Sequence, residues 1–449
     1  MLTRLLTWWH AVRASLWALP VAAVLGAIVL AIFTAQIRIS DTDHPAWYLF
    51  GGDAGDVTNF LANLTSAVMT LATLVVSITM VVLTLAAQQL GPRLIESFMS
   101  DRRTQAALAL FVGTAAYLLI LLRITSGSVE GVPNLALTLA SIFVGLSVIA
   151  LPVFVHHLAR SIVADNVIKR VGAALDHAVG EVLRADEGDG VDPNAYAIRE
   201  SDMPVRMGEG GYIQAIDIGR LVGVATENDA VIILKCRAGQ HVLPGSIGAF
   251  VRAAETPSEE MQAAVAKSVL FGQERTPVQD LEFWLRQLVE VGVRALSPGQ
   301  NDPYTVIAAV DRIALSLKLM MDRAPARTTW RDDDGRARLL LPVSTFEGLL
   351  DAAFDQIRQY GAAHPSVIIR LAEKLAQLWQ FANDEQRPPI EKHLDLVLDA
   401  GRRNFESSSD RADLERHVAA ALDDRTTAAA QAPEPVPPRS LARRLDIRH

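Results

Sequence analysis

The chain has 449 residues, of which 50% are hydrophobic and 20% are charged. Its formal net charge of −8 gives no reason to expect nucleic acid as a partner, and its one cysteine, Cys236, excludes an intrachain disulfide. Long charge-free runs occupy the chain up to about residue 160, and charged residues are abundant after it. This partition predicts a membrane domain followed by a soluble domain in a reducing compartment.

The first charge-free run extends from Ala14 to Ile37 and follows two arginines, Arg4 and Arg13. A run of this length spans a bilayer. A cleaved signal peptide is the alternative, because the N-terminus is basic. The run exceeds the apolar part of a signal peptide and no A-x-A site ends it, so the pattern favours an uncleaved membrane anchor.

Three further apolar runs follow. The second, from Val57 to Pro92, contains no ionised side chain, and as a helix it would reach about 54 Å, against roughly 30 Å of hydrocarbon. Part of it must therefore leave the bilayer, tilt or break. The third extends from Thr104 to Leu122 and the fourth from Gly131 toward Leu158. No run carries a charged residue near its centre, which weakens the case for ion-coupled transport.

Lysine and arginine mark alternate connections between these runs. They occur at the N-terminus, between the second and third runs, and after the fourth, whereas the connection from Arg38 to Asp56 is acidic. The positive-inside rule therefore predicts a four-span protein of the bacterial inner (plasma) membrane, with both termini in the cytoplasm. The lipid bilayer is its expected surrounding partner.

The second run carries polar residues at three- and four-residue steps, so on a helix they form one continuous stripe. Two interpretations stay open. Small hydroxylated residues allow helices to pack closely, with each hydroxyl bonded to the preceding turn. Alternatively, several copies of the helix line a water-filled path. The candidate pore-lining residues are Ser66, Thr70, Thr73, Ser77, Thr84 and Gln88.

After the fourth span the pattern predicts a cytosolic α+β domain, so the fold class is a mainly α membrane protein. Short β-like runs, Tyr212–Ile218, Val231–Arg237 and Ala249–Arg252, are separated by turn formers. The expected domain limits are 1–160 for the four membrane helices, 161–208 for a linker helix and loop, 209–254 for a small β-module, 255–425 for a helical domain and 426–449 for a disordered tail.

Helix-capping signals mark several elements of the helical domain. Thr276 and Pro277 predict one helix start, and Asp302 with Pro303 predict another as N-cap and first helical residue. The segment from Trp330 to Leu341 predicts a hairpin around an acidic turn. Further helices are expected near 345–360, 365–382, 389–404 and 410–423.

Three motifs together resemble a family of uncharacterised bacterial integral membrane proteins. The first comprises Ser77–Thr79, Thr84–Ala86 and Gly91–Leu94, followed by Phe98-Met99 and Asp101-Arg102, and the second is Gly211–Asp217. The third begins at Arg275-Thr276 with Gln279-Asp280 and continues through Ala295–Gly299 to Asn301-Asp302-Pro303. The chain has Gln300 where members usually carry an aliphatic residue. The resemblance implies four membrane helices plus a cytosolic domain with an ALSPG-x-NDP motif, and it implies no activity.

The third motif supplies the candidate residues of the cytosolic domain. A structural corner between two helices is one interpretation, because Ser-Pro-Gly and Asn-Asp-Pro restrict backbone angles. A ligand-gripping loop is the other. No nucleotide-binding glycine signature, nucleophile elbow or H-E-x-x-H pair is present, so no enzyme activity, cofactor or metal is predicted. The candidates are Arg275, Gln279, Asp280, Ser297, Asn301 and Asp302.

Two functional hypotheses follow. The first is an oligomeric channel-like or permeation protein, a homo-oligomer whose cytosolic domain gates or assembles it. The second is a non-conducting membrane scaffold or sensor whose cytosolic domain binds a partner or ligand. Four arginines between Arg439 and Arg448 predict a weak contact of the tail with anionic lipid.

Overall fold

The computed structural model of the chain describes residues 15–37, 54–90, 98–99, 101–126, 134–183, 197–323 and 326–428. The acidic first connection, the Gly91–Leu94 part of the first motif and the tail from residue 429 lie outside the described residues. In the expected tail, residues 426–428 instead belong to the last helix.

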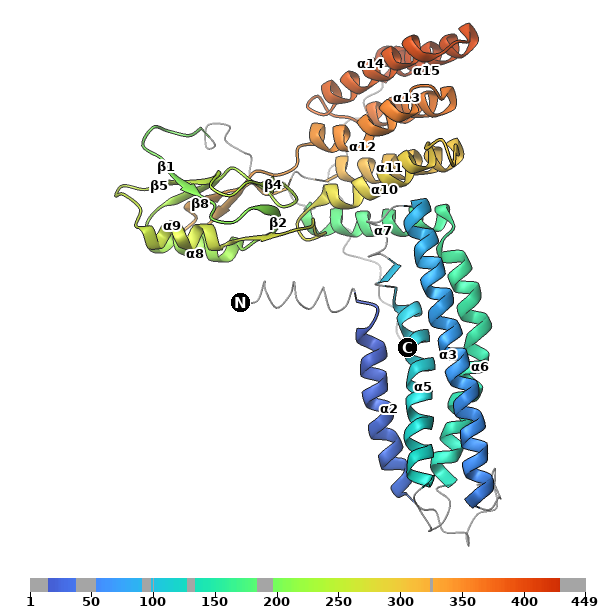
Figure 1. Ribbon diagram of the computed structural model, residues 1–449. Coiled ribbons are helices and arrows are strands. Elements are labelled where there is room, and N and C mark those ends of the chain that lie inside the picture. Colours follow the sequence, from blue (N-terminus) through green and yellow to red (C-terminus); the bar gives the residue numbers. More distant parts are fainter. Residues whose placement is uncertain are drawn as a thin grey trace, which may run out of the picture.

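Four helices at the N-terminal end are long and apolar enough to span a membrane, so the predicted set of four is confirmed. They lie side by side in one elongated bundle (Figure 1). α5 is the central helix. Half of the residues in its most apolar 18-residue segment are buried within the chain, whereas 11 to 22% are buried in the corresponding segments of the other three helices. The four helices are α2 (Ala18–Gln36), α3 (Ala54–Leu90), α5 (Arg102–Ser126) and α6 (Asn134–Ser161).

Tyr117 of α5 ties three helices of the bundle together. Its side chain is fully buried, and its hydroxyl lies 2.9 Å from the Thr34 hydroxyl of α2 and donates to the Ala136 carbonyl of α6 at 3.1 Å. Its ring meets Phe143 edge-on at 5.3 Å between centroids. A buried phenol needs such partners, because an unpaired hydroxyl in an apolar core is costly.

α3 packs on the bundle along one narrow seam. The seam residues recur at steps of three, four or seven positions, which is the spacing of helices that pack side by side over several turns. Among the described residues, this pattern leaves the opposite side of α3 without a neighbour. The buried seam residues are Val57, Leu61, Thr65, Val68, Ala72, Val75, Thr79 and Ala86.

The chain turns sharply after the bundle. α6 ends at Ser161 and α7 (Ala164–Val182) begins after a break at Ile162–Val163, so the expected linker helix is a separate helix lying across the end of the bundle (Figure 1). α7 buries an apolar stripe that includes Val167 and Leu175. Ala86 of α3 joins the same hydrophobic core, so the membrane bundle and the next domain share packing.

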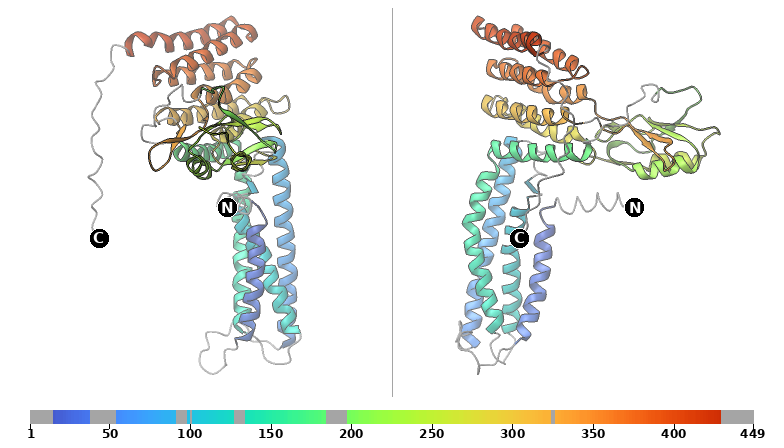
Figure 2. Two further views of the ribbon diagram at one scale, coloured as in Figure 1. Left: turned by 90° about the vertical axis from the view of Figure 1, so that its left-hand side faces the viewer. Right: turned by 180° about the vertical axis from the view of Figure 1, so that it is seen from behind.

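The helices that follow form tiers on α7. α10 and α11 contact α7, α12 and α13 contact α10 and α11, and α14 and α15 form the outermost tier. All views show these tiers receding from the bundle (Figures 1 and 2). We call α7 with these helices the helix stack. Its members after α7 are α10 (Leu281–Ala295), α11 (Pro303–Met321), α12 (Phe346–Gly361), α13 (Pro365–Gln380), α14 (Arg387–Asn404) and α15 (Ser408–Ala428).

Two small sheets with α8 and α9 form a sheet lobe beside the stack (Figure 2). One sheet has the order β1-β5-β3-β8-β7, in which β3 and β8 are parallel, and the other has the order β4-β2-β6. The elements are β1 (Met203–Arg206), β2 (Gly211–Ile216), α8 (Ile218–Glu227), β3 (Val231–Leu234), β4 (His241–Val242), β5 (Ile247–Arg252), α9 (Glu259–Lys267), β6 (Val269–Gly272), β7 (Thr329–Arg331) and β8 (Ala337–Leu340).

The sheet lobe differs from the expected β-module of 209–254. β1, β7 and β8 lie outside that range and complete the five-stranded sheet, and β6 completes the three-stranded sheet. β8 pairs with β3 across about a hundred residues of intervening chain. α8 was not predicted. It begins where the Asp217 side chain accepts from the backbone N–H of Arg220 at 3.2 Å, and it buries Leu221 and Ala225 at a helical spacing.

Two of the predicted helix starts can be compared with the structure. Asp302 caps α11 with Pro303 as its first residue, as predicted. The start predicted at Thr276–Pro277 is wrong, since α10 begins at Leu281 with Asp280 as its cap. The Thr276 hydroxyl donates to the Gln214 carbonyl of β2 at 2.9 Å, and this contact holds the segment against the sheet instead.

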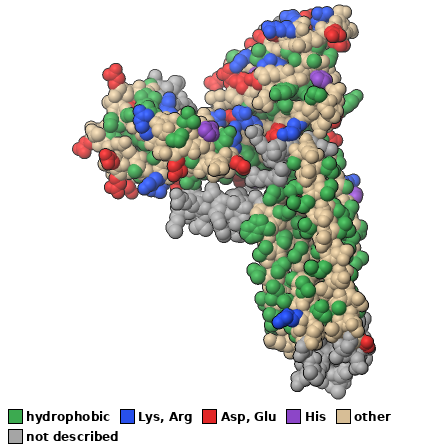
Figure 3. Space-filling model, in the orientation of Figure 1, with side chains coloured by type: hydrophobic (Ala, Val, Ile, Leu, Met, Phe, Trp, Pro, Cys, Tyr) green, Lys and Arg blue, Asp and Glu red, His purple; other side chains and the backbone are tan. Residues whose placement is uncertain are grey.

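Charge follows the same partition as the fold. Figure 3 shows hydrophobic side chains over the length of the bundle, whereas basic and acidic side chains gather over the helix stack and the sheet lobe. A surface this apolar fits a lipid environment and not water.

Candidate functional site

The predicted stripe on α3 lies on the free side of the helix. All six stripe residues are exposed in the single chain. At 100° per residue their mean direction is roughly 160° from that of the buried seam. The stripe therefore points away from the bundle, and none of its residues packs into the core of its own chain.

The threonines of this stripe satisfy their own hydroxyls. The hydroxyls of Thr70, Thr73 and Thr84 each donate to the carbonyl four residues earlier at 2.9 Å. Each donor is thus satisfied within the helix, although the oxygen keeps free acceptor capacity. The face is therefore polar, and its threonine hydroxyl protons are paired within the helix.

The polar face is longer than the sequence analysis indicated. Asn59 and Asn63 are also exposed and continue the stripe toward the start of α3. Asn59, Asn63 and Ser66 are separated by steps of four and three residues, and this spacing would have identified the two asparagines from the sequence. Thr65 and Thr79, by contrast, belong to the buried seam, which shows that hydroxylated residues occupy both sides of this helix.

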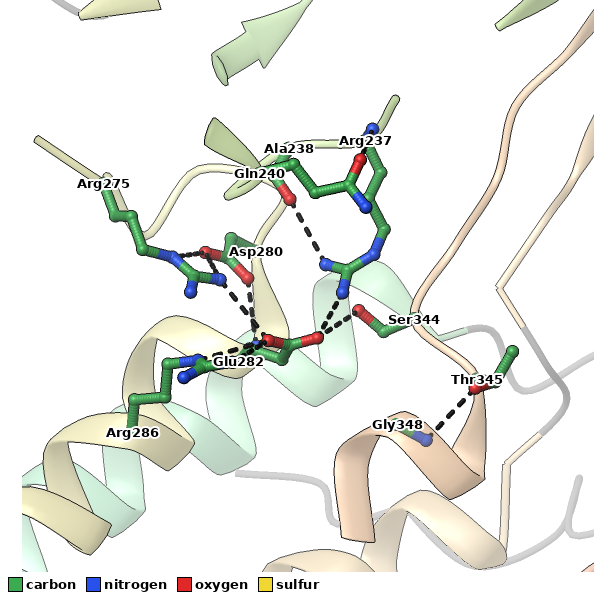
Figure 4. Close-up of polar contacts among 10 residues, drawn as sticks. All are labelled: Arg237, Ala238, Gln240, Arg275, Asp280, Glu282, Arg286, Ser344, Thr345 and Gly348. Atoms are coloured by element: carbon green, nitrogen blue, oxygen red, sulfur yellow. Dashed lines mark hydrogen bonds and ion pairs between the residues drawn. The ribbon is translucent and has the colours of Figure 1, made fainter. Parts of the chain in front are cut away.

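The first half of the third motif lies where the sheet lobe meets the helix stack. The Arg275 guanidinium contacts the Asp280 carboxylate through Nε at 2.9 Å and through Nη2 at 2.7 Å, and the Asp280 side chain is fully buried (Figure 4). Glu282, the second residue of α10, is almost as buried and pairs with Arg286 at 3.0 Å and with Arg237 of the β3–β4 turn. Three guanidinium groups thus surround two carboxylates.

The two carboxylates have different electrostatic surroundings. Burial raises the pKa of Asp280, and the Arg275 charge only partly offsets this. Burial also acts to raise the pKa of Glu282, but the charges of Arg237 and Arg286 outweigh it, so that its pKa is lowered. Glu282 is therefore firmly ionised and anchors the arginines of the junction.

Gln279 connects β2 to α10 through its amide. Its Oε1 accepts from the Ile216 N–H at 3.0 Å and its Nε2 donates to the Ile216 carbonyl at 3.2 Å, as a neighbouring strand would do. Its own backbone has φ of +58°, a conformation that L-residues adopt rarely. The side chain is thus occupied in joining the two parts of the domain.

The second half of the motif lies at the other end of α10. Asp302 caps α11 by accepting from the N–H groups of Tyr304 and Thr305 at 3.1 and 3.2 Å. The Asn301 N–H donates to the Ser297 carbonyl at 2.9 Å and so closes the turn. A helix of this length separates the two halves by roughly 20 Å. The six candidate residues therefore do not form one site.

One polar cluster was not predicted from the sequence. Ligand-type atoms of Asp351, Asp355 and His393 lie within 4.8 Å of one another, between α12 and α14. The His393 Nε2 is 3.0 Å from Asp351, but Lys392 and Arg358 already pair with the two carboxylates. The cluster is therefore a charge-balanced contact between helices. His393 is far from the aspartates in sequence, so spacing could not reveal it.

A bundle of four apolar helices bearing a helix stack and a sheet lobe defines an integral membrane protein with one large extramembrane domain. The model of the family described as "Predicted membrane protein (DUF2254)" matches residues 13–377, and the chain belongs to this family. The resemblance seen in the sequence is thereby confirmed.

Curated relatives extend the similarity to nearly the whole chain. Uncharacterised proteins of Mycobacterium bovis and of two strains of Mycobacterium tuberculosis are each 28% identical over 412 residues, covering 89% of this chain and 78% of the relative. Neither their names nor the family description states an activity. No solved structure shows significant similarity to the chain.

Proposed function

We propose that the protein forms homo-oligomers in which copies of α3 meet along their polar faces and line a permeation path across the inner membrane. The observation that carries this proposal is the exposure of the whole stripe, from Ser66 to Gln88, on the side of α3 that none of the described residues covers. The helix stack and sheet lobe then act as the assembly or gating domain.

The physical argument is the cost of placing this face against lipid. A leucine or valine face would lose nothing there, whereas serine, asparagine and glutamine side chains offer polar atoms that hydrocarbon cannot satisfy. Small polar residues also allow a close approach between helices. The steps of three, four and, from Ser77 to Thr84, seven residues along the stripe match the spacing at which two helices stay in contact over many turns.

The orientation of the protein belongs to the same proposal. The end of the bundle that carries α7 is the basic one, with Arg102 and Arg103 at the start of α5 and Arg160 at the end of α6. By the positive-inside rule this end lies in the cytoplasm, and the helix stack and sheet lobe with it.

Flux through purified protein in liposomes tests the permeation path. We expect potassium or chloride flux that Thr73→Leu and Ser77→Leu abolish, because a leucine narrows and dries the path. Val76→Leu is the matched control, since Val76 is exposed on the same helix but points about 90° away from the stripe. The permeation path is ruled out if both stripe substitutions leave the flux unchanged, or if the wild-type protein shows no flux at all.

The second candidate function is a non-conducting scaffold or sensor. It is favoured by one observation: the threonine hydroxyls already bond within the helix, so a dry contact between copies costs them little. Stable oligomers without flux would support this function over the first.

A further inference from the structure

A cavity of about 300 Å³ opens where the sheet lobe, the end of α7 and the start of α10 meet. Its walls come from distant parts of the chain: Val182 and Leu183 after the membrane bundle, Ile216 and Arg237 of the sheet lobe, and the segment from Ala326 to Ser344. Cavities at such junctions are common ligand sites, and this volume is at the lower end of their usual range. A ligand here would be small.

The Arg327 guanidinium at this cavity has no acidic partner in the part of the chain that the structure describes. It is half-buried, and its Cζ lies 5.1 Å from the centre of the Trp330 ring. Most arginines of the domain pair with carboxylates, as Arg237 does with Glu282 and Arg338 with Asp332. A half-buried cation held over an aromatic face and without a counter-charge is suited to an incoming anion.

Trp330 supplies a second donor. Its indole N–H is buried and has no hydrogen-bond acceptor among the described residues. Buried polar groups are normally paired, so an orphaned donor beside a cavity indicates a place for an acceptor brought by a ligand. Both Arg327 and Trp330 can only donate through these groups, which points to a ligand rich in acceptors.

The remaining wall is largely apolar. Ile216, Leu281 and Leu341 border the cavity, and Arg237 and Ser344 close the side that faces the ion pairs seen in Figure 4. Glu181 is the one carboxylate in the described lining, and its side chain is 70% exposed and pairs with His177 at 3.3 Å. An inorganic anion would leave the apolar wall empty, whereas a flat organic body would cover it.

We propose that this cavity binds a small planar organic anion, a phosphate or carboxylate on an aromatic body, with its charge on Arg327 and its ring against the apolar wall beside Trp330. Because α7 follows directly on α6, an occupied cavity would brace the helix leaving the membrane against the sheet lobe. The proposal stands apart from permeation, since binding is measurable whether or not the protein conducts.

The test uses the full chain in lipid nanodiscs, with phenyl phosphate and 1-naphthyl phosphate as probes. Calorimetry measures their binding, and thermal unfolding measures the stabilisation that they give. We expect a dissociation constant on the order of 0.1 to 1 mM for ligands of this size. Phenol, which lacks the charge, and inorganic phosphate, which lacks the ring, should bind at least about tenfold more weakly.

Variants assign the binding to this cavity. Arg327→Gln should weaken phenyl phosphate binding about tenfold or more, Arg327→Lys less, and Trp330→Phe a few-fold. Arg336→Gln is the matched control, because Arg336 is exposed at the far end of the same hairpin and does not line the cavity. Unfolding temperatures without ligand verify that each variant folds. Equal binding by Arg327→Gln and wild type, or no binding of either probe at about 10 mM, overturns the proposal.

Discussion

Arg275 holds the fully buried carboxylate of Asp280 through two of its nitrogens, at 2.9 and 2.7 Å. Asp280 also caps α10, accepting from the Glu282 N–H at 3.1 Å. One carboxylate thus joins the sheet lobe to the helix stack and starts the helix that packs on α7. This contact makes the junction sensitive to single substitutions.

Removing the Arg275 charge should destabilise the extramembrane domain strongly. Arg275→Met leaves Asp280 buried without its main counter-charge. Breaking a buried ion pair in this way should lower the free energy of unfolding by about 3 to 5 kcal/mol. Arg286→Met removes a more exposed arginine that pairs with Glu282 one turn along α10, and should cost about 1 kcal/mol or less. Denaturant unfolding monitored by circular dichroism measures the unfolding free energies of the two variants and of the wild type. Similar losses in both variants would contradict the special role of Arg275.

Glycine at position 239 is required for two separate reasons. Gly239 has φ of +82°, and a Cβ there would overlap Asp280 and Arg275. Gly245 has nearly the same φ, +80°, but open space around its Cβ position. Gly245→Ala should therefore cost about 1 to 2 kcal/mol from backbone strain alone.

Gly239→Ala should cost clearly more than Gly245→Ala, because it adds the clash at the ion pair to the same backbone strain. The difference between the two unfolding free energies measures the clash. Equal losses would show that the β3–β4 turn can move away from Asp280 without cost.

Thiol chemistry can map which side of α3 meets water. Burial raises the pKa of the Cys236 thiol to about 11, so the native cysteine should react slowly near neutral pH. Thr70→Cys, Thr73→Cys and Ser77→Cys should react with a charged, membrane-impermeant reagent if these positions line an aqueous path. Val76→Cys and Leu85→Cys, exposed on the two sides of the stripe and about 90° from it, should not.

Two other labelling patterns would contradict this prediction. Protection at all five positions would place the stripe against lipid or in a dry contact, in line with the scaffold. Equal reactivity at all five would show that the helix is not embedded as proposed. The wild-type chain, with Cys236 alone, gives the background.

His393 should make the α12–α14 contact sensitive to mild acid. Burial lowers its pKa below the usual value near 6.5, although Asp351 partly opposes this. The folded state therefore keeps the imidazole neutral while the unfolded chain takes up a proton. The associated stability is present above about pH 6.5 and is lost as the pH falls toward the folded-state pKa.

The measurement is the unfolding temperature between about pH 7.5 and 5.5 for wild type and His393→Gln. Wild type should lose more stability over this range, because glutamine does not titrate. Parallel curves for the two proteins would assign the acid sensitivity to other groups.

The sequence by itself determined the features that depend on short-range composition. A charge-free stretch such as Val57–Pro92 has few structural alternatives to a membrane helix, because only backbone hydrogen bonded within itself is stable in lipid. The start of α11 was also predictable, because Asp302 and Pro303 start the helix through contacts with residues next to them in the sequence. The polar spacing along α3 was visible for the same reason.

Only the tertiary structure decided which groups meet. Threonines lie on both sides of α3, and packing on the bundle alone turned Thr65 and Thr79 inward and Thr70 and Thr73 outward. Arg237 reaches Glu282 across 45 residues, and β8 completes the sheet of β3 across about a hundred. Contacts of this kind depend on how all the elements fill one core together, and no local pattern specifies them.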